Sequence, residues 1–239
     1  CFIQSVGDNL VGEGGIMDLW SREARLFKFG SGAGANFSAI RGAGEPLSGG
    51  GKSSGLMSIL KVGDAAAGAV KSGGVTRRAA KMVVVDGDHP DIEDFIRWKA
   101  VEEEKVAALV AGSRALSAHI PKIIAACWAS DGDDRTDPRR NEMLNAAVKA
   151  AKKDFVPEAS IRRAIELARA GARSASVARY DLDWDGEAYR TVSGQNSNNS
   201  VRLTDAFFET LEKNGDWTLT RRTDGTAAKT IKARKLWDA

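Results

Sequence analysis

Residues 81–112 read KMVVVDGDHPDIEDFIRWKAVEEEKVAALVAG and carry the strongest secondary-structure signals in the chain. The run KMVVVD is apolar and rich in β-branched residues, which predicts a buried strand over 81–86. A turn at Pro90 follows, and apolar residues then recur at helical spacing from Ile92 to Trp98. The stretch therefore predicts a strand, a turn and a long amphipathic helix in succession, which is the repeating unit of an α/β fold.

The segments on both sides continue this alternation. Residues 1–6, CFIQSV, predict a short buried strand, and 217–222, WTLTRR, alternate like a strand. Further helices are expected at 15–28, 56–71, 114–128, 139–153, 157–171 and 203–214, and in KTIKARKLWDA from residue 229. The polar run at 193–200 predicts a loop or an edge strand. Together the elements predict an α/β architecture with largely parallel strands.

The composition is that of an ordinary soluble globular protein. Of the 239 residues, 43% are hydrophobic and 28% are charged, and the formal net charge is +3. A balance so close to neutral predicts no direct nucleic-acid binding and no membrane association. Two cysteines are too few for a disulfide framework, and no apolar run is long enough to span a bilayer, so we expect a cytoplasmic location.

The two ends of the sequence predict an incomplete domain. The chain opens on Cys1 rather than on Met, directly inside a strand pattern, and it stops inside what reads as a helix. These features predict a processed or excised segment, for which protein splicing and simple truncation are both open explanations.

The glycine-rich motifs between residues 30 and 55 do not meet the requirements of known nucleotide-binding loops. GSGAG at 30–34 follows a predicted helix rather than a strand and lacks the G-x-G-x-x-G spacing of a dinucleotide fold. SGGGKSS at 48–54 is similar to a P-loop, but Pro46 occupies the position of its first glycine. A P-loop NTPase is therefore disfavoured. Exposed amides near 30–34 could still hold an anion such as phosphate.

Two other groups of residues are candidate sites. Arg77, Arg78 and Lys81 form a cationic cluster, which is either a solvated surface or a set of phosphate contacts. His89 and His119 are the only histidines, and no spacing of Cys, His, Asp and Glu suits a metal. We therefore predict no metal site and read both histidines as structural.

Three long blocks of sequence, in order, resemble the adenosylcobalamin-dependent (class II) ribonucleotide reductases. They are residues 1–96, which begin CFIQSVGDNLVGEGGIMDLW, then YDLDWDGEAY at 180–189, and SGQNSNNSVRLTDAFFE at 193–209. The resemblance implies the first part of a ten-stranded α/β barrel made of two half-barrels, with a helical insertion around 113–172. Residues 1–239 would then be one partial catalytic barrel domain.

The same resemblance implies a chemistry. Members of the family replace the ribose 2′-hydroxyl of a ribonucleotide by hydrogen, using a thiyl radical that class II enzymes start from adenosylcobalamin. It implies a ribonucleoside diphosphate as substrate, a deoxynucleotide as allosteric effector, a thioredoxin-type or dithiol reductant, and a homodimer formed partly through helices at 15–28 and 56–71.

The family's functional residues are carried over where the sequence matches. Cys1 matches the strand cysteine that is one half of the redox-active pair, and Ser31 and Gly32 match a turn that contacts substrate. The effector-binding stretch is matched by Asp8, Asn9, Leu10 and Arg41. The loop that couples the effector to the substrate pocket is matched by Ser72, Gly73, Gly74, Val75, Thr76, Arg77 and Arg78.

Other parts of the family pattern are missing from this sequence. The Asn-Pro-Cys-Ser-Glu block that supplies the thiyl cysteine is absent, as is a partner for Cys1, because Cys127 stands in a different context and reads as a core thiol. The chain is therefore predicted to be inactive alone and to require the C-terminal remainder of the reductase. The alternative is a non-catalytic deoxynucleotide-binding module that retains the effector site.

Overall fold

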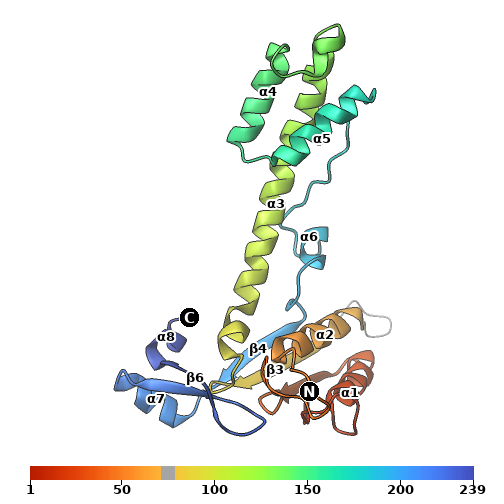
Figure 1. Ribbon diagram of the computed structural model, residues 1–239. Helices are drawn as coiled ribbons and strands as arrows, with labels where there is room; N and C mark the ends of the chain where they lie inside the picture. The colour runs from red at the N-terminus through yellow and green to blue at the C-terminus, as the bar shows by residue number, and fades with distance from the viewer. Residues whose placement is uncertain (71–78) are drawn as a thin grey trace. The chain divides into compact units, whose positions relative to one another are not determined.

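A computed structural model describes residues 1–70 and 79–239 (Figure 1). The chain divides into two compact units. Unit 1 comprises Cys1–Glu102 and Ser193–Ala239, and unit 2 comprises Glu103–Val192. Within the described residues, none of the helices is both long enough and apolar enough to cross a membrane.

Unit 1 is built on a four-stranded sheet in the order β1-β2-β3-β4, with every neighbouring pair parallel. The strands are β1 (Phe2–Gln4), β2 (Gly32–Asn36), β3 (Ala80–Asp86) and β4 (Ser197–Arg202). The helices α1 (Ile16–Lys28) and α2 (Leu56–Ala69) follow β1 and β2 along the chain and contact each other. This arrangement confirms the predicted α/β class with parallel strands.

The glycine stretch at 30–34, where the family resemblance places a turn at Ser31 and Gly32, contributes most of strand β2 instead. Its residues GAGAN pair with β1 on one side and β3 on the other. The small side chains have a physical reason, because a Cβ on Gly32 would lie 2.8 Å from Cys1 Sγ and 3.0 Å from Ala80 Cβ. The missing β-branched residues made this strand invisible to the sequence pattern.

Hydrophobic side chains from both helices and the sheet form the core of unit 1. Trp20 of α1 stacks on Phe37 at a centroid distance of 5.7 Å. Gly63 of α2 allows this packing, since a Cβ there would lie 2.4 Å from the Trp20 ring. Other fully buried members of the core are Leu19, Ile40, Leu56, Val85, Ile92 and Phe207.

The C-terminal part of unit 1 contains α7 (Asp205–Glu212), an antiparallel hairpin of β5 (Asp216–Thr220) and β6 (Ala227–Lys232), and α8 (Ala233–Trp237). The helix predicted over 203–214 and the strand from 217 are confirmed. The helix predicted from 229 is wrong over its first half. Ile231 is buried opposite Trp217, so this stretch pairs as a strand before α8 begins.

Unit 2 is the predicted helical insertion, with wider bounds than 113–172. It contains most of α3 (Ile92–Trp128), a 3₁₀ turn η1 (Asp133–Thr136), α4 (Glu142–Lys153), α5 (Glu158–Arg169) and the short α6 (Glu187–Arg190). Its own core gathers apolar residues from α3, α4 and α5, including Ile123, Leu144 and Ile161. Cys127 lies in this core, as expected for a structural thiol.

One helix replaces the two that were expected between 91 and 128. α3 runs unbroken past Gly112 and Pro121. Buried residues recur at helical spacing on both sides of the glycine, including Val106, Val110 and Ile120. Because this apolar pattern continues in phase, packing outweighs the weak local preference of glycine for ending a helix.

Candidate functional site

The first cluster of predicted site residues lies where β1 and β2 begin. Because Phe2 pairs with Ala33, Cys1 stands beside Gly32, and the absence of a side chain on Gly32 leaves room for the Cys1 sulfur. Cys1 is exposed and carries a free thiol. The adjacent Ser31 donates its backbone N–H to Leu26 O at 2.9 Å. The structure thus brings together all three residues predicted for the redox and substrate roles.

This edge has the properties that thiol exchange requires. An exposed thiol can be reached by a second thiol, whereas a buried one is inert. Cys127 provides the contrast, because burial raises the pKa of its thiol and its side chain is fully enclosed. Of the two cysteines, Cys1 is the one whose thiol is accessible to solvent.

The second cluster of predicted residues follows β1 and β2 at their C-terminal ends. Arg41 Nε donates to Asp8 Oδ2 at 2.6 Å, and its Nη1 donates to Pro46 O at 2.6 Å. The adjacent Asn9 shapes a compact loop, where its Oδ1 accepts the N–H of Gly12 at 2.6 Å. Leu10 is exposed beside it. Positions 8–10 and Arg41, which are distant in the sequence, therefore meet at one end of the sheet.

The predicted coupling loop, Ser72 to Arg78, lies outside the described residues. Lys81, which the sequence groups with its arginines as a possible phosphate contact, is described and does not fit that role. Its side chain is fully buried and forms an ion pair with Glu23 of α1, beneath the ring of Trp20 at 4.4 Å. The Lys81 amine is therefore enclosed in the protein core and is not accessible to a phosphate.

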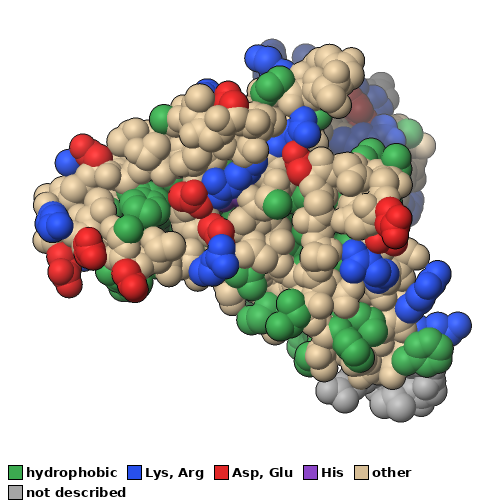
Figure 2. Space-filling model, turned by 90° about the horizontal axis from the view of Figure 1, so that it is seen from below, with side chains coloured by type: hydrophobic (Ala, Val, Ile, Leu, Met, Phe, Trp, Pro, Cys, Tyr) green, Lys and Arg blue, Asp and Glu red, His purple; other side chains and the backbone are tan. Residues whose placement is uncertain are grey.

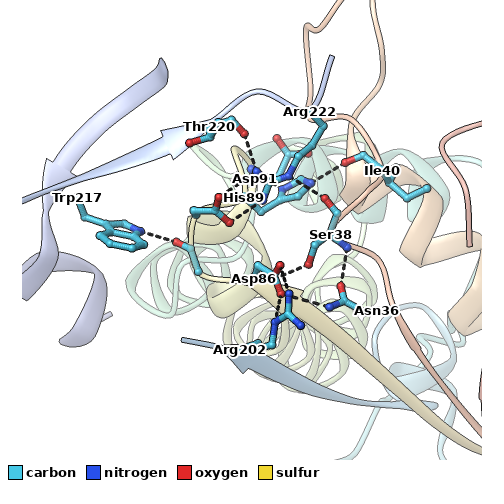
Figure 3. A network of polar contacts seen from close by, with 12 residues as sticks. Asn36, Ser38, Ile40, Asp86, His89, Asp91, Arg202, Trp217, Thr220 and Arg222 are labelled. Carbon is cyan, nitrogen blue, oxygen red and sulfur yellow. Dashed lines mark hydrogen bonds and ion pairs between the residues drawn. The ribbon is translucent and has the colours of Figure 1, made fainter. Parts of the chain in front are cut away.

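A pocket that the sequence did not reveal lies at the C-terminal ends of the strands (Figure 3). Its volume is about 350 Å³. The lining residues are Asn36, Ser38, Ala39, Asp86, Asp88, Arg202 and Arg222. The last residues of parallel strands meet at one edge of the sheet, so the position of Asp86 at the end of a predicted strand was a usable signal. Asn36 did not, because β2 had not been recognised as a strand.

Two bidentate ion pairs organise this pocket. Arg202 donates to both carboxylate oxygens of Asp86 at 2.7 and 2.6 Å, and Arg222 donates to those of Asp88 at 3.0 and 2.7 Å. Burial opposes ionisation of Asp86, but hydrogen bonds from Arg202 and Asn36 outweigh it and lower the pKa of this carboxyl. On the face seen in Figure 2, basic and acidic side chains are likewise interspersed.

Glu45, which lies in the segment after β2, binds the loop that connects β5 and β6. Its carboxylate accepts the backbone N–H groups of Gly42, Arg222 and Thr223 at 2.7 to 3.2 Å. Burial opposes the charge, yet these hydrogen bonds together lower the pKa of Glu45. Arg222 is held on its other side by Ser38 O at 2.7 Å, which fixes its guanidinium in the pocket wall.

His89 is structural, as the sequence predicted, and its surroundings define its protonation state. Its Nδ1 accepts the backbone N–H of Asp91 at 3.0 Å, so Nε2 carries the hydrogen and donates to Ile40 O at 2.7 Å. Burial lowers the pKa of this imidazole, which keeps the ring neutral. Asp91 in turn accepts the N–H groups of Ala43 and Leu56.

This geometry predicts a pH-dependent stability. Because the pKa of His89 is lower in the folded chain than its ordinary 6.5, the unfolded chain binds the proton first as pH falls. The stabilisation is complete above pH 6.5 and is lost as pH drops toward the folded pKa. We expect the free energy of unfolding, measured by urea denaturation, to fall as the pH decreases below 6.5.

The matched variant is His89→Gln, which removes the titrating group. It should lower stability at neutral pH by about 1–3 kcal/mol, because buried hydrogen bonds are lost. Its stability should also change less with pH than that of the unmodified chain over the same interval. Parallel pH profiles for the two proteins would contradict the lowered pKa of His89.

The sequence is similar to several known proteins along its whole length. A family model described as "Ribonucleotide reductase, barrel domain" matches residues 1–239. The chain is 62% identical over 240 residues to a vitamin B12-dependent ribonucleotide reductase of Agrobacterium fabrum and 60% identical to that of Bradyrhizobium diazoefficiens. All of this chain is covered in both, but only 19% of either relative. A vitamin B12-dependent ribonucleoside-diphosphate reductase of Mycobacterium tuberculosis is 43% identical over 101 residues, which are 42% of this chain and 14% of that protein.

Proposed function

The chain belongs to the ribonucleotide reductase barrel-domain family, and from this premise we propose that it forms part of the catalytic barrel of an enzyme that reduces ribonucleoside diphosphates to 2′-deoxyribonucleotides. The single observation that carries the proposal is the placement of Cys1 beside Gly32 at the edge of the parallel sheet. An exposed thiol next to a residue that has no side chain is accessible both to a substrate and to a second thiol.

Cys1 is proposed to supply one of the two thiols that reduce the substrate. Cys1 and a second cysteine from the remainder of the protein give up two electrons and two protons and form a disulfide, while the ribose 2′-hydroxyl leaves as water and is replaced by hydrogen. A dithiol or thioredoxin-type reductant then returns both thiols by exchange. Ser31 and Gly32 would contact the substrate, because Gly32 lies directly beside the Cys1 sulfur and Ser31 precedes it.

Adenosylcobalamin is the cofactor proposed for the complete protein, on the strength of the relatives' names. When bound, it supplies the radical that starts the reaction. We assign none of the described residues to it. Their part is to hold the redox thiol in place beside Gly32.

The loop at 8–10 and Arg41 are proposed to bind a deoxynucleotide effector. The guanidinium of Arg41 is partly exposed and is oriented by Asp8, which suits it to contact a phosphate. We also propose a homodimer that uses α1 and α2, which expose the apolar side chains of Met17 and Val62.

A reduction assay tests the proposed function. Cytidine diphosphate, adenosylcobalamin, a dithiol and a deoxynucleotide effector are incubated with this chain alone and then with the complementary C-terminal segment. We expect deoxycytidine diphosphate only in the mixture. Binding of a deoxynucleotide without turnover in the mixture would favour a non-catalytic nucleotide-binding module, and turnover by the chain alone would contradict the requirement for the remainder.

A further inference from the structure

Positive charge is concentrated in one part of the chain. Residues 139–179 hold ten basic and four acidic residues, a formal net charge of +6, whereas the whole chain carries +3. The rest of the chain is therefore net negative by three. The basic stretch lies entirely within unit 2 and includes α4 and α5. The near-balanced total, which predicted no nucleic-acid binding, conceals this local excess.

Helices α4 and α5 form a tight hairpin that exposes the basic side chains. α4 ends at Lys153 and α5 begins at Glu158, and Lys152 Nζ lies 3.8 Å from Glu158 Oε2 across the turn. The apolar faces of both helices are buried in the core of unit 2. Within the described part of the chain, the exposed Lys149, Lys153 and Arg162 have no ion-pair partner, so their charges are available to a ligand.

An exposed aromatic ring stands at the turn of this hairpin. Phe155 is 92% exposed and adopts a positive φ of 57°. The N–H of Phe155 donates to Lys152 O and that of Val156 to Ala151 O, at 3.2 and 3.0 Å. This is a left-handed helix stop, in which glycine is the usual residue. The Phe155 ring does not contribute to the core, and its residue adopts a backbone conformation that a bulky side chain disfavours. We therefore infer that the ring contacts a molecule outside the chain.

We propose that the α4–α5 hairpin binds single-stranded nucleic acid. Phe155 stacks on a base, and Lys153 and Arg162 contact phosphates on either side of it. Aromatic rings set among basic side chains are the usual means of binding single strands without sequence preference. The inference concerns unit 2 and does not depend on the reductase activity.

Two other polyanionic partners fit the surface less well. An anionic membrane favours a broad apolar face, but the only large hydrophobic side chains exposed between 139 and 179 in the described chain are Met143 and Phe155. An acidic peptide would use the charges but would leave the isolated ring without a stacking partner. A base with its attached phosphate uses both features.

Fluorescence anisotropy of a labelled oligothymidylate with the 239-residue chain tests the proposal. We expect binding at about 50 mM salt that weakens strongly at about 200 mM. Phe155→Gly should weaken binding by about tenfold or more, which is the effect of removing one stacked base. Its circular dichroism should be unchanged and its Tm equal or higher, because glycine fits the left-handed backbone.

The charged side chains have their own variant and controls. Lys153→Glu combined with Arg162→Glu should lower the slope of log K against log salt by about 0.7 for each phosphate that the protein no longer neutralises. Phe29→Ala, which removes an 82% exposed ring elsewhere, and Lys213→Glu should leave binding unchanged.

Four outcomes overturn the proposal. They are no binding at low salt, unaltered binding by Phe155→Gly, equal competition by polyglutamate, and tighter binding to phosphatidylserine vesicles than to the oligonucleotide.

Discussion

Replacing Cys1 by serine in the assembled reductase is expected to lower dithiol-dependent turnover by at least about 10³-fold, the scale of loss when a reacting side chain is itself removed. A serine hydroxyl cannot form a disulfide, so the two electrons that the proposed reaction requires would have no source at this position. The space above Gly32 accepts the smaller oxygen without rearrangement. The measurement is the steady-state formation of deoxycytidine diphosphate with excess dithiol.

The control for this prediction is the other cysteine of the chain. Cys127→Ala removes a thiol that is buried in the core of unit 2, and it should leave the rate per folded enzyme unchanged. Thermal unfolding of the Cys1→Ser protein should also match the parent, because Cys1 is exposed. Normal dithiol-driven turnover by Cys1→Ser would remove the basis of the proposed redox role.

The second large effect concerns the buried ion pair between Lys81 and Glu23. Lys81→Met leaves the Glu23 carboxylate enclosed without its cation, and we expect a loss of about 3–5 kcal/mol in the free energy of unfolding. Burial already raises the pKa of Glu23, and the charge of Lys81 is what opposes that shift. Urea denaturation of the chain measures the loss.

A double replacement distinguishes the charge effect from lost packing. Lys81→Met with Glu23→Leu removes both charges and should recover most of the stability, because well-packed apolar residues often replace a buried pair at little cost. Lys229→Met breaks the exposed pair with Glu93 and should cost less than about 1 kcal/mol. A loss of that small size for Lys81→Met would show that the buried charge is not essential.

The elements with strong local patterns were predictable from the sequence. β3 carries a β-branched signal and the start of α3 an amphipathic one, and α7 ends two residues before Asn214, which adopts a positive φ of 49°. Elements fixed by neighbours were not predictable. β2 depends on the close approach of β1 and β3, and β6 depends on its pairing with β5.

The candidate site divides in the same way. Cys1, Gly32, Asp8 and Arg41 were named through the family resemblance, and the structure places them in two clusters at opposite ends of the strands. The pocket at Asp86 and the other strand ends was missed, because its residues come from four separate segments whose meeting depends on the register of the sheet. No local pattern in the sequence records that register.

The way in which unit 2 interrupts unit 1 has a consequence for the order of folding. The strands β3 and β4 pair with each other in the sheet but are separated in the sequence by the whole of unit 2. Asp86 and Arg202, which are in contact, are 116 positions apart in the chain. Such non-local pairing is slow, whereas the helical contacts of unit 2 are local and fast. On the ribosome, we expect the helices of unit 2 to consolidate while β1, β2 and β3 still await their fourth strand. During that interval the edge of β3 is an unprotected template for intermolecular pairing, so chaperone dependence would arise from chain order rather than from weak final stability.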